Sequence, residues 1–258
     1  MVETLISDKN PLLKEVRRLA AGGAPGAGSL DARLALAEGP HLLIEAIRSR
    51  IEIHAVILAE SAGEIPDVGG TRVVRVLDGL FNKLASTESP QGVLALVRLP
   101  EWTAQDLCPK EPRGTPLVVV LDGVQDPGNA GAILRTAEAF GATGAVFLKG
   151  SVNPSNPKCL RASAGSAFRL PIVAEIPPGL KLYAADPRAE LSVSQAHLSV
   201  ACAIVIGAEG RGVGPELAAR ATGLKIPTAG VESLNAAVAA GILLYEARRQ
   251  RTTSENPK

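Results

Sequence analysis

The chain has 258 residues, of which 46% are hydrophobic and 21% are charged, and its formal net charge is +1. This composition is typical of globular proteins and excludes an intrinsically disordered chain, and the length predicts two modest domains. Residues 1–115 hold 13 basic and 15 acidic side chains, and residues 116–258 hold 14 and 11. The chain therefore lacks the large surplus of cations that marks a strongly basic nucleic-acid binder.

The apolar runs and the N-terminal residues bear on the cellular location of the protein. No apolar run reaches the roughly 20 residues of a membrane-spanning helix, and charges interrupt residues 1–16, where a signal peptide needs its apolar region. We expect a cytoplasmic protein with no membrane partner.

The cysteines and histidines give no sign of a metal site. They are few and scattered: Cys108, Cys159 and Cys202, and His41, His54 and His197. Their spacing fits neither a disulfide framework nor a zinc site nor a His-based triad. We expect buried, reduced thiols and no metal.

The first hundred residues alternate helical and strand patterns, which predicts a small α/β unit. In chain order we expect a helix over 10–21, a strand over 35–37, a helix over 42–47, strands over 53–60 and 71–77, a helix over 77–84 and a strand over 92–99. A Gly-rich loop, residues 21–29, follows the first helix. Residues 100–116 carry four prolines, which suits a linker. We place the domains at 1–105 and 117–252, with a linker at 106–116.

The second half alternates strands and helices more regularly. We expect strands over 116–124, 145–148, 170–176, 180–186, 202–210 and 224–227, and helices over 130–140, 158–167, 215–221 and 234–251. Near-continuous Val, Ile and Leu runs joined by helices predict an α/β fold, a mostly parallel sheet with helices on both faces. Residues 252–258 read as a disordered tail.

Two Gly-containing turns follow strands of the predicted sheet. The run GAEGRGVG, from Gly207 through Gly212 to Gly214, suits either a ligand site or a tight turn, and it matches neither GxGxxG nor a Walker A loop, which argues against a dinucleotide-binding enzyme. The run DPGNAGAILR opens a helix, with Asn129 as a candidate N-cap, Gly131 in the first turn and Arg135 on the second. Arg135 alone is equally compatible with a solvated side chain.

A third segment, VESLN, leads into the last helix. Ser233 is a candidate cap for this helix, and the Ala-rich run that includes Gly241 makes a small-residue face suited to close helix packing. A GxSxG elbow is absent from the sequence, and Gly165-Ser166 indicates helix packing and not a nucleophile.

Together these three segments resemble the three motifs of the SpoU (TrmH-like) RNA 2′-O-ribose methyltransferases of the SPOUT superfamily, over roughly residues 117–250. DPGNAGAILRTAEAFGA resembles the first motif, VIGAEGRGV the second and IPTAGVESLNAAVAAGILLYE the third. The matching positions are Asn129, Gly131, Arg135, Gly207, Glu209, Gly212, Pro227, Ser233 and Asn235. The resemblance implies a deep trefoil knot, S-adenosylmethionine as cofactor and a homodimer.

The resemblance also implies residue roles. The cofactor is expected to lie against backbone groups around Gly207, Ile226 and Leu234, near Gly212 and Pro227. Arg135 is expected to be the catalytic residue, either as general base or, because arginine stays protonated, as an electrostatic stabiliser of the developing alkoxide. Asn129 and Glu209 would orient Arg135 and the ribose. Ser233 and Asn235 would line the active site.

The N-terminal part resembles the RNA substrate-binding domain often found ahead of this catalytic domain, through the runs ALAEGPHLLIEAI and KLASTESPQGVLALV. Such a domain can grip structured RNA by shape and 2′-hydroxyl contacts, which needs few surplus cations. The two-domain layout favours 23S ribosomal RNA as substrate. Transfer RNA, a base instead of a ribose as methyl acceptor, and a knotted RNA-binding protein without activity are the alternatives.

Overall fold

The computed structural model describes residues 3–5, 9–22, 33–108 and 114–255, and the chain divides into two compact units. Unit 1 comprises Met1–Glu101 and Ser155–Arg169, and unit 2 comprises Trp102–Pro154 and Leu170–Lys258. Most of the predicted Gly-rich loop, residues 23–29, lies outside the described residues. The domain limits 1–105, 106–116 and 117–252 stay a prediction.

Unit 1 contains a five-stranded mixed sheet with the strand order β1-β4-β3-β5-β2. The described strands are β1 (Glu3–Thr4), β2 (Leu34–Glu38), β3 (Glu52–Ala59), β4 (Arg72–Val76) and β5 (Val93–Arg98). The helices between them are α1 (Pro11–Ala20), α2 (Pro40–Arg48) and α3 (Asp78–Leu84). The predicted order of helices and strands is confirmed, and β1 is an addition that two residues were too few to predict.

The core of unit 1 follows the apolar periodicity of its elements. Helix α1 begins at Pro11 after the N-cap Asn10, whose Oδ1 accepts a hydrogen bond from Leu12 N at 2.9 Å. Its buried face packs with α3 against alternate residues of the sheet, among them Ile57 and Leu94. Burial of these apolar side chains is the main stabilising contribution to this unit.

The segment 155–169 is bound to the rest of unit 1 through buried carboxylates. It contains α5 (Pro157–Ser163) and a 3-10 turn, η1 (Ser166–Phe168). Glu38, at the end of β2, is 5% exposed and pairs with Arg161 Nη1 at 3.2 Å. Glu38 also accepts hydrogen bonds from Thr87 Oγ1 at 2.6 Å and from the Ser86 hydroxyl. The carboxylate therefore joins α5 to the loop that precedes β5.

A second carboxylate, Glu45 on α2, pairs with Arg169 Nη1 at 2.8 Å and with Arg48 Nη1 at 3.0 Å. Burial raises the pKa of Glu45, but the hydrogen bonds from Arg169 and Arg48 outweigh it and hold this pKa below its ordinary value. The predicted helix over 158–167 ends early, at Ser163, because Ala164 and Gly165 adopt left-handed conformations. A side chain at Gly165 would place its Cβ 2.7 Å from Glu45 Cβ, so glycine permits this close approach.

Unit 2 contains a six-stranded sheet with the order β11-β9-β10-β6-β7-β8, and every strand pair in it is parallel. The described strands are β6 (Leu117–Asp122), β7 (Gly144–Phe147), β8 (Ile172–Val173), β9 (Lys181–Ala185), β10 (Cys202–Gly207) and β11 (Thr222–Leu224). The helical elements of unit 2 are α4 (Pro127–Ala139), η2 (Val193–Gln195), α6 (Pro215–Ala218) and α7 (Ala236–Glu255). The predicted α/β fold with a parallel sheet is confirmed.

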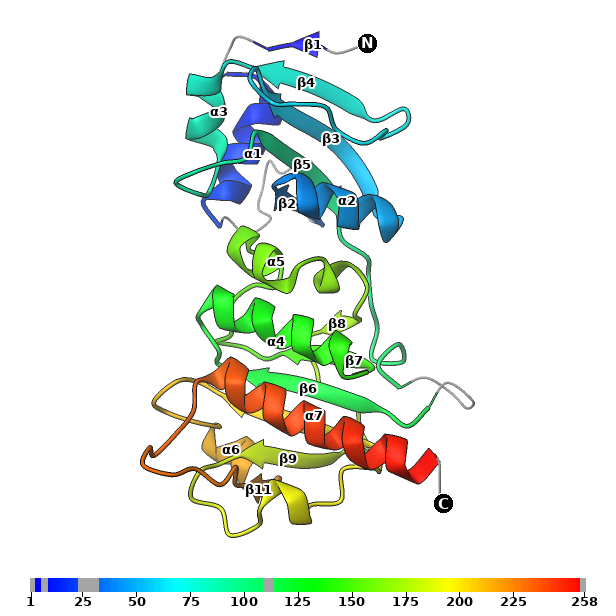
Figure 1. Ribbon diagram of the computed structural model, residues 1–258, viewed down its shortest axis with the longest axis vertical. Coiled ribbons are helices and arrows are strands. Elements are labelled where there is room, and N and C mark those ends of the chain that lie inside the picture. The colour runs from blue at the N-terminus through cyan, green and yellow to red at the C-terminus, as the bar shows by residue number, and fades with distance from the viewer. Residues whose placement is uncertain (1–2, 6–8, 23–32, 109–113, 256–258) are drawn as a thin grey trace. The chain divides into compact units, whose positions relative to one another are not determined.

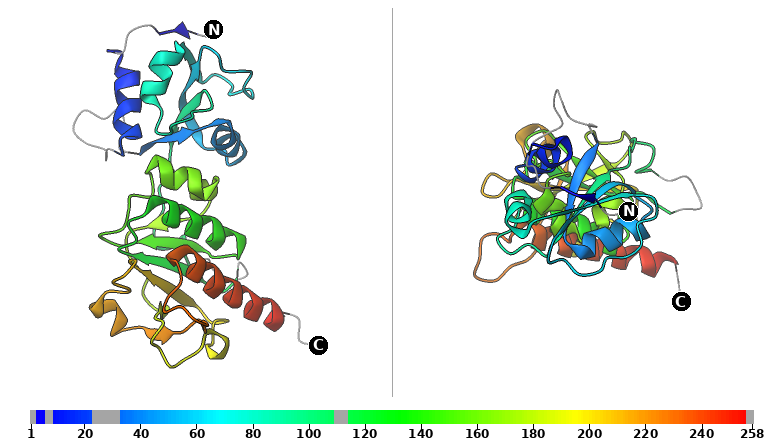
Figure 2. Two further views of the ribbon diagram at one scale, coloured as in Figure 1. Left: turned by 60° about the vertical axis from the view of Figure 1, so that its left-hand side comes forward. Right: turned by 90° about the horizontal axis from the view of Figure 1, so that it is seen from above.

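Both faces of this sheet are covered. Helices α4 and α7 lie side by side on one face, as Figures 1 and 2 show, and Phe140 and Tyr245 meet edge to face at 5.6 Å between them. On the other face, alternate strand residues pack against Leu217 of α6 and against Leu107. Leu107 falls within the predicted linker 106–116, yet it is fully buried in this core. Its backbone oxygen accepts a hydrogen bond from Thr143 Oγ1 at 2.6 Å.

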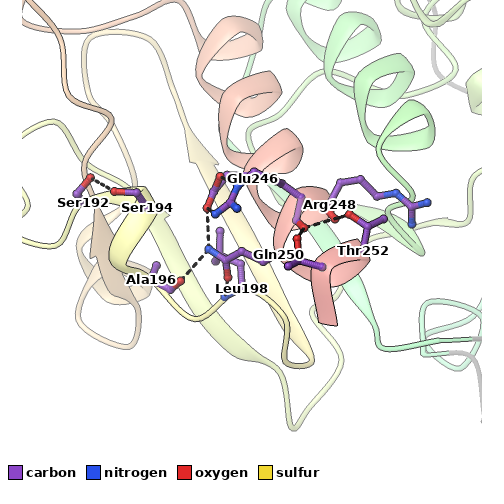
Figure 3. Close-up of polar contacts among 10 residues, drawn as sticks. Ser192, Ser194, Ala196, Leu198, Glu246, Arg248, Gln250 and Thr252 are labelled. Carbon is purple, nitrogen blue, oxygen red and sulfur yellow. Dashed lines mark hydrogen bonds and ion pairs between the residues drawn. The ribbon is translucent and has the colours of Figure 1, made fainter. Parts of the chain in front are cut away.

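The end of α7 is fastened to neighbouring backbone by two side chains, which we call the α7 clamp. Gln250 accepts a hydrogen bond from Leu198 N at 2.8 Å and donates one to Ala196 O at 3.0 Å (Figure 3). Arg251 donates to the carbonyl oxygens of Leu198 at 3.0 Å and Val200 at 2.6 Å. It also donates to the carbonyl oxygens of Thr115 and Pro116, just before β6.

The predicted disordered tail over 252–258 is wrong for residues 252–255, which continue α7. Thr252 Oγ1 lies 3.0 Å from Arg248 O, and Thr253 Oγ1 lies 2.9 Å from Arg249 O, so both hydroxyls bond to the preceding turn. Back-bonding of this kind satisfies the hydroxyls of both threonines within the helix.

The three cysteines are free thiols, and Cys159 and Cys202 are buried while Cys108 is only half-buried, which corrects the prediction for that residue. Burial raises the pKa of Cys159 to about 12. In the described residues, no helix is both long and apolar enough to cross a membrane.

Candidate active site

A cleft of about 830 Å³ opens in unit 2 at the carboxyl ends of β9, β10 and β11. This is the edge at which parallel sheets bind ligands, and the volume lies in the roughly 300–1,000 Å³ range of small-molecule sites. Of the residues predicted to function, six line the cleft: Gly207, Glu209, Gly212, Ile226, Ser233 and Leu234. The second and third sequence motifs therefore meet in one cleft.

The loop after β10 folds back on itself at the mouth of this cleft. Ala208 and Gly212 exchange two backbone hydrogen bonds, at 3.1 and 2.8 Å. A Cβ at Gly207 would lie 2.1 Å from the backbone carbon of Gly212, so only glycine fits at position 207. Gly210 and Gly212 have φ values of +76° and +71°, a left-handed conformation that glycine adopts without steric cost because it has no Cβ. The sequence left a ligand site and a tight turn as alternatives, and the loop is a tight turn that lines the cleft.

A network of three side chains joins the three motifs. Asn129 Nδ2 donates a hydrogen bond to Glu209 Oε1. Asn235 Nδ2 lies 3.0 Å from Asn129 Oδ1 and 3.4 Å from Glu209 Oε1. Asn129 lies in the first turn of α4, Glu209 lies in the loop after β10, and Asn235 directly precedes α7. The sequence predicted roles for all three residues but not their mutual contacts.

Two capping predictions are wrong, and the corrections explain the network. Asp126, not Asn129, caps α4, because Asp126 Oδ1 accepts from Asn129 N at 2.7 Å. Asn235, not Ser233, caps α7, because Asn235 Oδ1 accepts from Ala237 N at 2.9 Å and from Val238 N at 3.2 Å. Asn129 is thereby released to contact Glu209, and Ser233 stays exposed on the wall of the cleft.

The remaining predicted site residues lie outside the cleft. Arg135 is exposed on α4, between one and two helical turns beyond the network residue Asn129, and it is not part of the cleft wall. Pro227 is exposed between the lining residues Ile226 and Thr228. Gly131 is buried in the first turns of α4.

Sequence reasoning missed several polar residues of the site. Asp122, the last residue of β6, accepts a hydrogen bond from Gly214 N at 2.7 Å and so joins the strand before the first motif to the residue after the second. Four charged side chains of the cleft wall were also missed: Asp186, Arg188, Arg211 and Glu232. The one available signal was position, since Asp122 ends β6 and Asp186 directly follows β9.

The charge of the cleft suits S-adenosylmethionine. That molecule carries a sulfonium, an ammonium and a carboxylate, and so has one surplus positive charge. The cleft wall supplies the opposite balance, with three carboxylates against the two guanidiniums of Arg188 and Arg211. Glycine backbone around Gly207 and Gly212 allows close approach to a ligand.

Comparison with known proteins agrees with this geometry. Residues 116–245 match the SpoU rRNA Methylase family, and residues 30–95 match the MRM3-like substrate binding domain. An uncharacterized tRNA/rRNA methyltransferase of Synechocystis is 33% identical over 99% of this chain and 97% of its own length. The 23S rRNA (guanosine(2553)-2′-O)-methyltransferase RlmP of Bacillus subtilis is 32% identical over 83% of this chain and 88% of its own.

A solved structure extends the likeness to three dimensions. The AdoMet-bound rRNA methyltransferase of Sinorhizobium meliloti is 28% identical, with a TM-score of 0.80, over 96% of this chain and 98% of its own. The matches cover both units and all three motifs. This chain belongs to the SpoU rRNA methylase family.

Proposed function

We propose that this protein transfers the methyl group of S-adenosylmethionine to a ribose 2′-hydroxyl of 23S ribosomal RNA. The observation that carries the proposal is the Asn129–Glu209–Asn235 network, which unites the three motifs beside a cleft of suitable size and charge. The choice of 23S ribosomal RNA is supported by the name of the Bacillus subtilis relative and by the match of residues 30–95 to a substrate-binding domain.

The cofactor supplies an electrophilic methyl group on a sulfonium sulfur. In the transfer the ribose 2′-oxygen would gain this methyl group, S-adenosylhomocysteine would be the leaving group, and the hydroxyl proton would pass to solvent water. Gly207, Ile226 and Leu234 would hold the cofactor in the cleft that they line, and the amides of Asn129 and Asn235 would orient the ribose. Alignment of the oxygen with the methyl group accounts for much of the rate in a reaction of this kind.

Arg135 stabilises the negative charge that develops on the ribose oxygen. A guanidinium keeps its proton at any physiological pH, so electrostatic stabilisation suits it better than proton abstraction. Its exposure on α4 leaves it accessible to a substrate as large as RNA, which extends beyond the cleft.

A homodimer through α7 is part of the proposal. Val238, Ile242 and Tyr245 recur at helical spacing and are 52%, 37% and 56% exposed, which makes an apolar stripe along one side of the helix. A second copy packed on this stripe would bury it, and Ile242→Asp is expected to give a monomer by light scattering. The trefoil knot implied by the family resemblance also belongs to this proposal.

The decisive experiment measures methyl transfer and cofactor binding separately. Arg135→Ala should abolish transfer to a 23S ribosomal RNA transcript, while the affinity for S-adenosylmethionine in a calorimetric titration stays unchanged. Retained transfer would refute the role of Arg135. A wild-type protein that binds no S-adenosylmethionine would instead support an RNA-binding protein without activity, and nucleoside analysis of the product would distinguish ribose from base methylation.

A further inference from the structure

Arg211 is a cation on the cleft wall that no described side chain neutralises. It is exposed, it lines the cleft, and it makes no hydrogen bond or ion pair with the described residues. The carboxylate nearest to it in the sequence, Glu209, is already engaged, because Glu209 Oε1 accepts from the amides of Asn129 and Asn235. The amide network therefore leaves the guanidinium free to bind an anion.

The backbone that carries Arg211 is held at both ends. Arg211 lies between Gly210 and Gly212 in the turn closed by the paired backbone hydrogen bonds of Ala208 and Gly212. Three residues after Arg211, Gly214 N donates a hydrogen bond to Asp122 Oδ2 at 2.7 Å. A side chain mounted on such a fixed turn loses little backbone freedom when it binds a ligand.

The guanidinium of Arg211 lies against the turn that follows β6. A Cβ at Gly123 would be 2.9 Å from Arg211 Nη2, so the absence of a side chain at Gly123 makes room for the guanidinium. Three residues further, this turn reaches Asp126, the cap of α4, and then Asn129. Arg211 is thus placed between the cleft and the segment that bears the first motif.

We propose that Arg211 binds a backbone phosphate of the RNA substrate and thereby positions the target ribose at the Asn129–Glu209–Asn235 network. This inference rests on the proposed function, since that proposal makes RNA the substrate. It gives a role to Arg211, to which the proposed function assigns none. A planar guanidinium donates two parallel hydrogen bonds to a phosphate.

The carboxylate of S-adenosylmethionine is the other anion that could reach Arg211. RNA is favoured because Arg211 is exposed, whereas Gly207, Ile226 and Leu234, which are expected to hold the cofactor, are half-buried. The half-buried residues suit a small molecule inside the cleft, which is the cofactor. Arg211, which is exposed on the cleft wall, is accessible to the larger RNA.

The test compares Arg211→Gln with Arg220→Gln in the full chain. Arg220 is an exposed arginine of the same unit that does not line the cleft, so it controls for the loss of one positive charge. For Arg211→Gln we expect the KM for a 23S ribosomal RNA transcript to rise about tenfold and the slope of log affinity against log salt to fall by about 1. The Kd for S-adenosylmethionine should be unchanged, and Arg220→Gln should behave as wild type.

Two results would overturn the inference. Weaker S-adenosylmethionine binding with an unchanged KM for RNA would assign Arg211 to the cofactor carboxylate, and wild-type values for both ligands would leave it without a role. Direct binding of the same transcript, measured by filter retention, separates this inference from the proposed function. Arg211→Gln must weaken that binding even if the wild-type protein transfers no methyl group.

Discussion

Asn235 Nδ2 lies 3.0 Å from Asn129 Oδ1, although 106 positions separate the two residues in the chain. The same amide of Asn235 caps α7 through its oxygen, which accepts from Ala237 N and Val238 N. One side chain thus fixes the start of a helix and contacts the first motif. These two roles use different atoms and can be separated by substitution.

Asn235→Asp should reduce methyl transfer while it preserves the fold. Aspartate keeps an oxygen to cap α7, but it loses the donor to Asn129 and places a second negative charge beside Glu209. We expect the rate of transfer to fall at least tenfold, by about 1.4 kcal/mol or more in transition-state stabilisation. Asn235→Ala should lose the cap as well, at a further cost of about 1 kcal/mol in the free energy of unfolding. A wild-type rate for Asn235→Asp would show that the network does not serve the reaction.

Gly207→Ala should abolish cofactor binding, whereas Gly210→Ala should not. A Cβ at position 207 would collide with backbone at 2.1 Å, so the turn of residues 207–213 must move. At Gly210 no atom lies within 4 Å of the added Cβ, and the cost is conformational only, about 1 kcal/mol. Calorimetric titration measures the affinity of each variant for S-adenosylmethionine. Equal affinities for Gly207→Ala and Gly210→Ala would contradict this account of the turn.

Arg251→Ala should destabilise unit 2 through the α7 clamp. The substitution removes the donor for backbone oxygens at Leu198, Val200 and Pro116, and we expect a loss of about 2–3 kcal/mol in the free energy of unfolding. Arg249→Ala is the control, since Arg249 is exposed on the same helix and pairs only with Glu246 among the described side chains. Urea denaturation compares the two, and equal midpoints would exclude a stabilising role for the clamp.

The stability contributed by Glu45 should depend on pH. The pKa of Glu45 in the folded protein lies below its ordinary value of 4.5, so its stabilising effect is complete above that pH and is lost as the pH falls through the folded-state value. The difference in the free energy of unfolding between wild type and Glu45→Gln should be constant above about pH 5 and shrink in more acidic solution. Glu64→Gln, at an exposed position of unit 1, is the control. A difference that grows with acidity would contradict the sign of the shift.

The fold was predictable where the chain obeys local rules. The apolar runs of β6 and β10 are long enough to predict buried parallel strands, and a parallel sheet follows from the helices between them. The caps were not predictable to the residue, because Asp126 and Asn129, like Ser233 and Asn235, are both good capping types within one turn. Which of the two caps the helix depends on where the other side chain finds a partner, and those partners are distant in sequence.

The cleft was predictable only in part for the same reason. Gly207, Ile226 and Leu234 line it as expected, but the position of Arg135 outside the cleft wall depends on the rotation of α4 against the sheet. Periodicity over a short helix does not fix that rotation when both neighbouring faces are apolar. Leu107 was assigned to the linker for a related reason: its burial depends on a gap in the sheet packing beside Gly144, where an added Cβ would lie 2.6 Å from Leu107 Cγ.

Residues 155–169 belong to unit 1 by their contacts, although the chain enters them from unit 2 and returns to unit 2 afterwards. Unit 1 therefore cannot be exchanged between relatives by a fusion at one position of the chain. A chimera would need three joins, and the arginines that pair with Glu38 and Glu45 must be exchanged together with β2 and α2, which carry those carboxylates. We therefore expect the partners in each ion pair, Arg161 with Glu38 and Arg169 with Glu45, to change together during evolution. A substitution of one partner would favour a compensating substitution more than a hundred residues away in the chain.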